Sequence, residues 1–550
     1  MNPSLRDDVV AWMALDPDEN DRRTLSDLLD ADNEIELERR FAAPLTFGTA
    51  GLRGPEMAGP AGMNRATVRR ATQGVLAWLD EIGVDAKRGV VVGRDARRGS
   101  ETFNDEVVRV LLGAGAVVFE LPSPLPTPFV PYCVKALNAA AGVMITASHN
   151  PPQDNGYKLY APDGAQIIPP DDEIVERHAR NAGPATLADR SAPGHTTVAS
   201  SLLDEYRAHF LGRFRVDGGS DLRITYTPLH GVGGETMMSL FADAGYANVT
   251  PVSSQFKPDG SFPTLPFPNP EEPGALELAI ETADDSNSAL IIANDPDADR
   301  LGAAARTDEG WHLLRGDEIG WLLASALLDE IGAAQQMVAT TIVSSTMLEK
   351  MANASGVACA TTLTGFKWIA RAAGRGVLGF GYEEALGFAV DARVADKDGL
   401  SAALALSRLA HDLSLKGQSV LDRLDELETR FGVHATSQLA LRAAGPEGPA
   451  LIRRVVAELG AAPPTMLGTL SVREVVDLND GWRGLQPTEG LFFGLGEWGR
   501  VIVRPSGTEP KVKAYVEVTP PQEGSIAGQR ALGAELTRAV TASLSSLLRF

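Results

Sequence analysis

Three aspartates at alternate positions are the first residues whose types and spacing suggest chemistry. In the stretch NDPDADR, Asp295, Asp297 and Asp299 follow the apolar run ALIIAN and precede Arg300. An extended backbone would direct the three carboxylates to one side, where they repel one another unless a cation joins them. Oxygen ligands without a nearby histidine or cysteine favour a hard ion, and Mg²⁺ suits a site that leaves room for a phosphate oxygen. The flanking strand and arginine favour this Mg²⁺ site over an acidic surface turn.

A second stretch, RPSGTEPK, has the composition of a phosphate-binding loop. It follows the strand-like run RVIV and contains Arg504, Ser506, Gly507, Thr508 and Lys511. Two cations, two hydroxyl groups and a glycine that leaves backbone N–H groups accessible can surround a phosphate. We therefore predict an anion site here.

Three further loops contain candidate ligand groups. Arg53 lies among the glycines of FGTAGLRG, where its guanidinium can bind an anion through two hydrogen bonds. Glu383 and Glu384 in YEEALG follow a strand-like run and offer acceptors for sugar hydroxyls, although paired glutamates are most often solvated. Lys397 lies between two aspartates in VADKDGL, where a surface salt-bridge cluster would be the usual explanation.

The stretch TASHNPPQDNGYK places one hydroxyl group, that of Ser148, between an apolar run and a polar turn. His149 is a possible base beside it. Neighbouring side chains usually point apart, so a hydrolase dyad is not favoured. The sequence also lacks the GxSxG elbow of the α/β hydrolases and the GxxxxGK[ST] loop of the P-loop nucleotide hydrolases.

These loops must be positioned by alternating strands and helices. Apolar runs that end in polar loops occur at 89–100, 140–150, 223–235, 288–300, 338–348 and 376–387. Segments with helical spacing separate them, which predicts βαβ units whose loops meet at the carboxyl ends of the strands. The chain from about residue 432 mixes strands with two helical segments and predicts a smaller α+β domain.

The predicted fold class is therefore α/β, with three related mixed-sheet α/β domains and a C-terminal α+β domain around a central cleft. We expect a helical N-terminal extension at 1–40 and α/β domain I with the Ser148 loop at 41–215. The remaining expected domains are α/β domain II with the metal loop at 216–328, α/β domain III with the YEEALG loop at 329–431, and α+β domain IV with the RPSGTEPK loop at 432–550.

Composition restricts the function classes. The 550 residues include 44% hydrophobic and 22% charged residues, as expected of a folded multidomain chain. A formal net charge of −22 argues against binding nucleic acid over a broad surface.

No signal peptide or apolar run of about 18 residues is found, so no membrane partner is expected. Only two cysteines occur, which favours a reducing, cytoplasmic location. Oligomeric state is not encoded in any recognisable pattern.

Four of these stretches in order, TASHNP, DPDADR, YEEALG and RPSGTEPK, resemble the signature loops of the α-D-phosphohexomutase superfamily. The resemblance spans nearly the whole chain. It implies that Ser148 is a phosphoserine in the active enzyme and that Mg²⁺ is bound by this phosphoserine together with Asp295, Asp297 and Asp299. It places Arg53, His149, Lys158, Arg300 and Lys397 at the reaction centre. It implies that the substrate is bound by Arg300, Thr364, Gly365, Glu383, Arg504, Ser506, Gly507 and Thr508.

The activity implied by the resemblance is a phosphosugar mutase, an isomerase that interconverts hexose 1-phosphate and hexose 6-phosphate of glucose or mannose. It implies sugar phosphates as partners and glucose 1,6-bisphosphate, or the matching bisphosphate, as intermediate and activator. The family's sugar loop commonly reads GEESFG, whereas Ala385 replaces its serine here. With FGTAGLRG, TLTGFKWI and DKDGLSAA, this variant resembles the branch containing the second type of phosphoglucomutase, phosphopentomutase and glucose-1,6-bisphosphate synthase. Phosphopentomutase activity on ribose or deoxyribose 1-phosphate, or bisphosphate synthesis, is the alternative; a sugar-phosphate sensor without turnover is disfavoured by the intact serine and metal loops.

Overall fold

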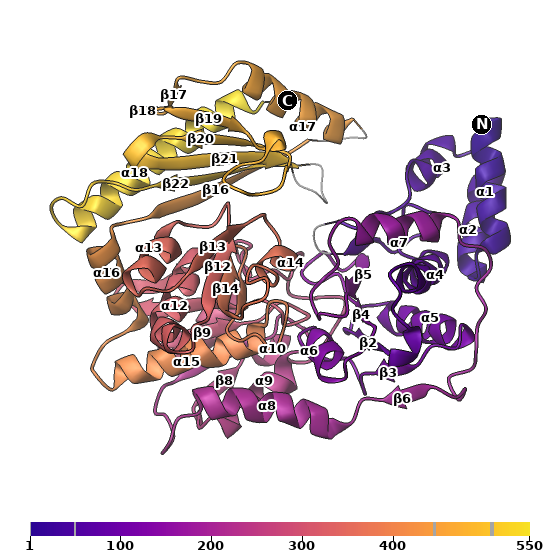
Figure 1. The fold of residues 1–550 in the computed structure, drawn as a ribbon, viewed down its shortest axis with the longest axis horizontal. Helices are drawn as coiled ribbons and strands as arrows, with labels where there is room; N and C mark the ends of the chain where they lie inside the picture. The colour runs from indigo at the N-terminus through magenta and orange to yellow at the C-terminus, as the bar shows by residue number, and fades with distance from the viewer. Residues whose placement is uncertain (1, 49–50, 444–446, 506–510, 550) are drawn as a thin grey trace. The chain divides into compact units, whose positions relative to one another are not determined.

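The computed structural model describes residues 2–48, 51–443, 447–505 and 511–549. The chain forms two compact units (Figure 1). The first comprises Met1–Arg315 with Ala385–His411, and the second Gly316–Glu384 with Asp412–Phe550. Within the described ranges, no helix combines the length and the apolar character needed to cross a membrane.

The first unit begins with three helices, each preceded by a polar residue that caps it. Asn2, Asp18 and Asn33 accept hydrogen bonds from backbone N–H groups of the first helical turns, which those groups cannot make within the helix. The helices are α1 (Pro3–Leu15), α2 (Glu19–Asp30) and α3 (Glu34–Phe41). Their apolar side chains form a buried cluster that includes two alanines from the region that follows: Val9, Trp12, Leu25, Leu37, Ala58 and Ala66.

A six-stranded mixed sheet follows, in the order β1-β5-β4-β2-β3-β6. The strands β4, β2, β3 and β6 are parallel neighbours, whereas β5 is antiparallel to both β4 and β1. The strands are β1 (Leu52–Pro55), β2 (Val90–Arg94), β3 (Val118–Glu120), β4 (Ala141–Ile145), β5 (Asp154–Tyr160) and β6 (His195–Thr197). The helices and the 3-10 turn η1 are α4 (Arg65–Glu81), η1 (Ala86–Arg88), α5 (Ser100–Gly113), α6 (Phe129–Ala136), α7 (Asp171–Arg180) and α8 (Ser200–Phe214).

The second sheet of this unit has five strands in the order β11-β10-β9-β7-β8. The strands β8, β7 and β9 are parallel, and β10 and β11 continue the sheet as antiparallel strands. The strands are β7 (Ile224–Thr227), β8 (Val249–Pro251), β9 (Leu290–Ala293), β10 (Gly302–Thr307) and β11 (Gly310–Leu314). The helices are α9 (Gly234–Asp243), α10 (Ser253–Phe256) and α11 (Glu277–Asp285).

The second unit contains a parallel arrangement of three strands, in which β12 lies between β13 and β14. The strands are β12 (Met337–Thr341), β13 (Cys359–Thr362) and β14 (Leu378–Glu383). The helices of this part are α12 (Gly316–Ala333), α13 (Met347–Ala354), α14 (Phe366–Ile369) and α16 (Val420–Phe431). Between β14 and α16 the chain forms β15 (Gly387–Ala389) and α15 (Gly399–Ser414).

The C-terminal part of the second unit is an antiparallel sheet in the order β16-β22-β21-β20-β19. Its strands, with the small hairpin β17–β18, are β16 (Ala435–Arg442), β17 (Met466–Leu467), β18 (Leu470–Ser471), β19 (Glu474–Asp477), β20 (Leu491–Gly494), β21 (Gly499–Pro505) and β22 (Lys511–Val518). The helices and short 3-10 turns are α17 (Gly448–Ala461), η2 (Leu478–Asp480), η3 (Gly496–Trp498) and α18 (Ile526–Leu547). The predicted fold class, three α/β sheets and a C-terminal α+β sheet, is confirmed.

A buried carboxylate lies in the first turn of α12. Asp317 Oδ1 accepts hydrogen bonds from the backbone N–H of Ser345 at 2.8 Å and from the hydroxyl of Tyr382 at 2.9 Å. Burial raises the pKa of Asp317 to about 7, and repulsion from Glu384 and Glu517 acts in the same direction. The folded protein therefore holds a proton on Asp317 in a pH range where the unfolded chain has lost it. This side chain contributes stability below pH 4, and the contribution is lost as the pH rises to about 7.

We expect Asp317→Asn to remove this pH dependence while the amide oxygen keeps both hydrogen bonds. The free energy of unfolding of the wild type should fall by about 3 kcal/mol more than that of the variant between pH 5 and pH 8. Urea unfolding at both pH values measures this difference. Asp329→Asn, at an exposed position on the same helix, is the matched control and should follow the wild type. Parallel curves for wild type and Asp317→Asn would contradict the assignment.

Candidate functional site

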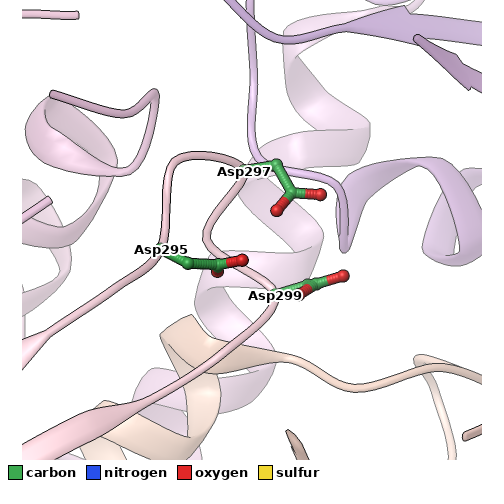
Figure 2. A group of neighbouring side chains, drawn as sticks. All are labelled: Asp295, Asp297 and Asp299. Atoms are coloured by element: carbon green, nitrogen blue, oxygen red, sulfur yellow. The ribbon is translucent and has the colours of Figure 1, made fainter. Parts of the chain in front are cut away.

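The three aspartates lie on a turn that follows β9. The N–H of Ala298 donates to the carbonyl of Asp295 at 2.8 Å, and Ala298 has a positive φ of 56°. The expectation of an extended backbone was therefore wrong, yet the turn also brings the carboxylates together. One oxygen from each of Asp295, Asp297 and Asp299 lies within 4.8 Å of the others. Figure 2 shows the three side chains leaving the loop toward the same side.

The turn is held by neighbours far away in the sequence. Thr127 donates twice to Asp297, from its N–H to the carbonyl at 2.9 Å and from its hydroxyl to Oδ2 at 2.6 Å. The N–H of Val232 donates to the carbonyl of Pro296 at 2.8 Å. A Cβ atom at Gly231 would lie 2.4 Å from the backbone of Pro296, so only glycine allows this approach. These contacts fix the carboxylates before any ligand binds.

Two lysines compensate the charge of the aspartates. Lys158 Nζ lies 2.6 Å from Oδ2 of both Asp297 and Asp299, and Lys397 Nζ lies 3.0 Å from Asp299 Oδ2. Burial alone would raise the pKa of Asp299, but the two lysines and Arg300 outweigh it and hold that pKa below its ordinary value. The same balance, with Lys158 as the main cation, lowers the pKa of Asp297. Both side chains are therefore carboxylates at neutral pH.

The donor set fits a hard divalent cation. Oδ1 of Asp297 and Oδ1 of Asp299 are buried and have no hydrogen-bond partner among the described residues. Burial, followed by repulsion from the other two aspartates, raises the pKa of Asp295, as expected of three carboxylates gathered without a metal. A cation among the three carboxylates would bind the two oxygens that have no hydrogen-bond partner, and it would reduce the repulsion. Carboxylate oxygens are the ligands that Mg²⁺ prefers.

Ser148 lies directly beside the aspartates. Its backbone has a positive φ of 53°, and its N–H donates to the hydroxyl of Thr146 at 2.8 Å. Its Oγ donates to Asp295 Oδ2 at 2.6 Å and lies 3.1 Å from Nδ1 of His149. The expectation that the adjacent serine and histidine side chains point apart was therefore wrong. A strained backbone conformation at a buried hydroxyl is common where a residue is held for reaction.

Cations lie close to His149, the neighbour of Ser148. Burial lowers the pKa of His149, and the nearby Arg300 and Arg53 lower it further, so the imidazole is neutral at neutral pH. Arg53 Nε is buried without a hydrogen-bond partner among the described residues. The backbone N–H of Arg300 donates to Asp295 Oδ1 at 3.0 Å, and its guanidinium donates to the carbonyl of Ala385. The arrangement concentrates positive charge where a phosphoryl group on Ser148 would lie.

Sequence reasoning missed Arg97, which holds the loop of Ser148. Its guanidinium donates to the carbonyls of Ser148 at 2.6 Å, Asn150 at 2.5 Å, Pro151 at 2.8 Å and Asp154 at 3.0 Å. The signal available was an arginine directly after a strand, in GRDARRGS, but which loop it binds depends on the tertiary fold.

The loop of Lys397 is also held by residues that sequence reasoning missed. Asp396 Oδ2 accepts from the hydroxyl of Tyr160 at 3.0 Å and from Nε2 of Gln166 at 2.8 Å, while its Oδ1 accepts from the N–H of Lys397. Asp398 caps α15 by accepting from the N–H groups of Leu400 and Ser401. Lys397 is therefore fixed at the entry of α15, and it is buried with the aspartates on either side of it, so the surface salt-bridge cluster suggested by the sequence is not what the structure contains.

The remaining predicted site residues belong to the second unit. Thr364 and Gly365 follow β13, and Glu383 ends β14, so all three lie at the carboxyl edge of the parallel strands. Glu383 is buried. Arg504 lies in β21, opposite Lys513 of β22. Ser506, Gly507 and Thr508 lie outside the described residues.

Four family models match the chain. The model described as "Phosphoglucomutase/phosphomannomutase, alpha/beta/alpha domain I" matches residues 44–185, and those for domains II and III match 204–310 and 315–431. The model of the C-terminal domain of the same family matches residues 451–525.

Similar proteins include a Haemophilus influenzae protein described as a probable phosphomannomutase, 37% identical over 462 residues, or 83% of this chain and 93% of that protein. The phosphopentomutase of Mus musculus is 33% identical over 574 residues, which cover 96% of this chain and 92% of that protein. Among solved structures, a phosphoglucomutase/phosphomannomutase family protein from Burkholderia thailandensis matches with a TM-score of 0.68 and 19% identity, covering 90% of this chain and 97% of that one.

Proposed function

Because this chain belongs to the phosphoglucomutase/phosphomannomutase family and is a phosphomutase, we propose that it interconverts the 1-phosphate and 6-phosphate of glucose or mannose. Ser148 is the phosphoryl carrier, and the hexose 1,6-bisphosphate is the intermediate. The observation that carries the proposal is the hydroxyl of Ser148, which lies 2.6 Å from an aspartate of a buried three-carboxylate cluster and next to His149, whose pKa nearby cations lower.

The reaction consists of two phosphoryl transfers in opposite directions. In the first, the bond from Ser148 Oγ to phosphorus breaks, a sugar hydroxyl oxygen bonds to phosphorus, and the proton of that hydroxyl passes through a base to the released Oγ. Neutral His149, with Nδ1 at 3.1 Å from Ser148 Oγ, is a base within reach of this proton. The second transfer returns the other phosphate of the bisphosphate to Oγ, which the hydrogen bond to Asp295 holds in place.

Charge neutralisation by fixed groups accelerates such transfers. Asp295, Asp297, Asp299 and the phosphorylated Ser148 would hold Mg²⁺, which supplies positive charge to the transferring phosphoryl oxygens when bound. Lys158, Lys397, Arg53 and Arg300 add positive charge from the protein itself. Glu383 binds sugar hydroxyls, and Thr364 and Gly365 line the same end of the site. Arg504 with Ser506, Gly507 and Thr508 binds the phosphate that is not reacting.

Removal of divalent cations should abolish turnover. We expect excess EDTA to lower kcat by about 10³-fold or more, because the aspartates then lack the ion that offsets charge in the transition state. Added Mg²⁺ should restore activity and also raise the unfolding temperature in a concentration-dependent way, since it binds the folded state. Full activity in EDTA would contradict the proposed requirement for Mg²⁺.

A substrate panel tests the proposed reaction. Purified protein is given Mg²⁺ and a trace of the matching bisphosphate, and the specificity constants for glucose, mannose, ribose and deoxyribose 1-phosphates are compared. The proposal predicts isomerisation, with glucose 1-phosphate preferred, and little release of free phosphate. If no sugar phosphate is isomerised, the proposed function is refuted. Release of free phosphate in place of isomerisation would indicate a phosphatase.

A pentose substrate is the second candidate, and Ala385 is the observation that favours it. This residue offers no side-chain hydroxyl beside Glu383, and its carbonyl already accepts from Arg300. One hydrogen bond is worth about 1 kcal/mol, enough to shift preference several-fold. If the panel favours ribose 1-phosphate, Ala385→Ser should shift the ratio of specificity constants toward glucose 1-phosphate. An unchanged ratio would show that this position does not set the preference.

A further inference from the structure

A short loop of the second unit, residues 342–346 between β12 and α13, contacts the proposed sugar-binding strand end. The hydroxyl of Ser344 donates to Glu384 Oε2 at 2.9 Å, and the backbone N–H of Glu384 donates back to the hydroxyl of Ser344 at 3.2 Å. The hydroxyl of Thr341 adds a contact of 3.3 Å to the same carboxylate. These reciprocal bonds fix the backbone directly after Glu383.

The same loop is bound on its other side by one buried carboxylate of the C-terminal sheet. Glu517 Oε1 accepts from the hydroxyl of Ser345 at 2.7 Å and from the N–H of Thr346 at 2.8 Å, and it lies 2.8 Å from Nδ1 of His434. Its Oε2 accepts from Nε of Arg500 at 3.0 Å. Burial alone would raise the pKa of Glu517, but Arg500 and His434 outweigh it and lower that pKa, so the group is charged.

Arg500 completes the connection, because it also donates to the carbonyl of Ser344 at 2.5 Å. Arg500 and Glu517 are register partners on β21 and β22, the hairpin that carries Arg504. His434 lies in the segment that joins α16 to β16. Apolar contacts support the polar ones. Ile342 and Val343 are buried in one cluster with Leu478, Phe492, Ile502 and Tyr515 of the C-terminal sheet.

We propose that Ser344, Arg500 and Glu517 are positioning residues that couple the β21–β22 hairpin to Glu384 and thereby hold Glu383 in place for the sugar hydroxyls. The inference rests on the proposed role of Glu383 and Arg504 in binding opposite ends of the substrate. Charge-assisted bonds among buried groups are strong and directional, so a change at the hairpin is transmitted to the strand end.

Kinetics separate this role from a purely structural one. Ser344→Ala removes the hydroxyl bonds to Glu384 and leaves the backbone carbonyl for Arg500. We expect KM for glucose 1-phosphate to rise about tenfold with little change in kcat. A tenfold change in KM corresponds to the loss of about one hydrogen bond to a charged group. The inhibition constant for inorganic phosphate should stay unchanged, because phosphate alone does not contact Glu383. Ser344→Thr should restore KM, and Ser355→Ala, at an exposed position nearby, is the matched control.

A second variant, Glu517→Gln, interrupts the connection at the hairpin. It should also raise KM about tenfold, and the double variant should be no worse than either single one, because both interrupt the same connection. The inference would be overturned if the two increases in KM multiplied in the double variant. It would also be overturned by an unchanged KM in Ser344→Ala, or by a change confined to kcat or to the unfolding temperature. If the wild type isomerises no sugar phosphate, the proposed function fails instead, so the two failures are distinguishable.

Discussion

Replacing Ser148 by alanine is expected to lower kcat by about 10⁴-fold or more, because it removes the hydroxyl that lies 2.6 Å from Asp295 and carries the phosphoryl group in the proposed reaction. The variant should fold, since it loses only the bonds from its Oγ to Asp295 and His149. Its Oγ contributes nothing to the four carbonyl contacts of Arg97 that hold the loop. The measurement is the rate of glucose 1-phosphate isomerisation with saturating bisphosphate.

Mass spectrometry of the same samples gives an independent readout. Wild-type protein incubated with bisphosphate should carry one phosphate on the peptide containing Ser148, and Ser148→Ala should carry none there. Ser200→Ala, at an exposed serine of the same unit, should retain both phosphorylation and activity. Activity within tenfold of wild type in Ser148→Ala, or a phosphate found on another residue of the active protein, would refute the proposed carrier.

Asp299→Asn is expected to have the second-largest effect, acting on both stability and rate. Asp299 is the one aspartate of the cluster that contacts both Lys158 and Lys397. Without its charge, the excess of the four cations (the two lysines, Arg53 and Arg300) over the aspartates of the cluster grows, because two carboxylates remain in place of three. Breaking a buried ion pair from one side costs about 3 to 5 kcal/mol. Loss of one of three proposed metal ligands should lower kcat by about 10³-fold.

Urea unfolding in Mg²⁺-free buffer measures the first effect, and kcat across a Mg²⁺ titration measures the second. Asp308→Asn, at an exposed turn in the same unit, is the control and should change neither. Asp297→Asn should destabilise the protein less, because Lys158 keeps Asp299 as its partner and Lys397 is not affected. Equal losses in the two variants would contradict the role of Asp299 as the shared partner.

The sequence predicted the family and the fold class, and it singled out Ser148 and the three aspartates, which lie in loops that follow the apolar strands β4 and β9. It predicted the backbone of the metal loop wrongly. Alternate spacing suggested an extended strand, whereas the chain turns at Ala298 and Gly231 makes room for Pro296. Short-range patterns identify which side chains are candidates, but a turn of this kind depends on neighbours from other segments.

Residues that act through distant contacts could not be predicted. Arg97 binds four carbonyls of a loop about fifty residues away in the chain, and Asp396 accepts bonds from Tyr160 and Gln166, which are far from it in the sequence. Glu517 and Ser345 are also far apart in sequence. A lone arginine or glutamate in a sequence reads as a solvated surface residue, and only the tertiary fold reveals that it is buried and bonded.

The path of the chain has a consequence for protein synthesis. Residues up to Arg315 enter the first unit, the chain then builds part of the second, and Ala385–His411 returns to the first. During translation the aspartates therefore leave the ribosome before Lys397, and a nascent chain stopped at Arg315 holds Asp299 with Lys158 but without its other cation. The acidic cluster reaches its final charge balance only after the strands β12 to β14 have also been made. A gene fragment ending at Arg315 thus lacks Lys397, which contacts Asp299 in the full chain.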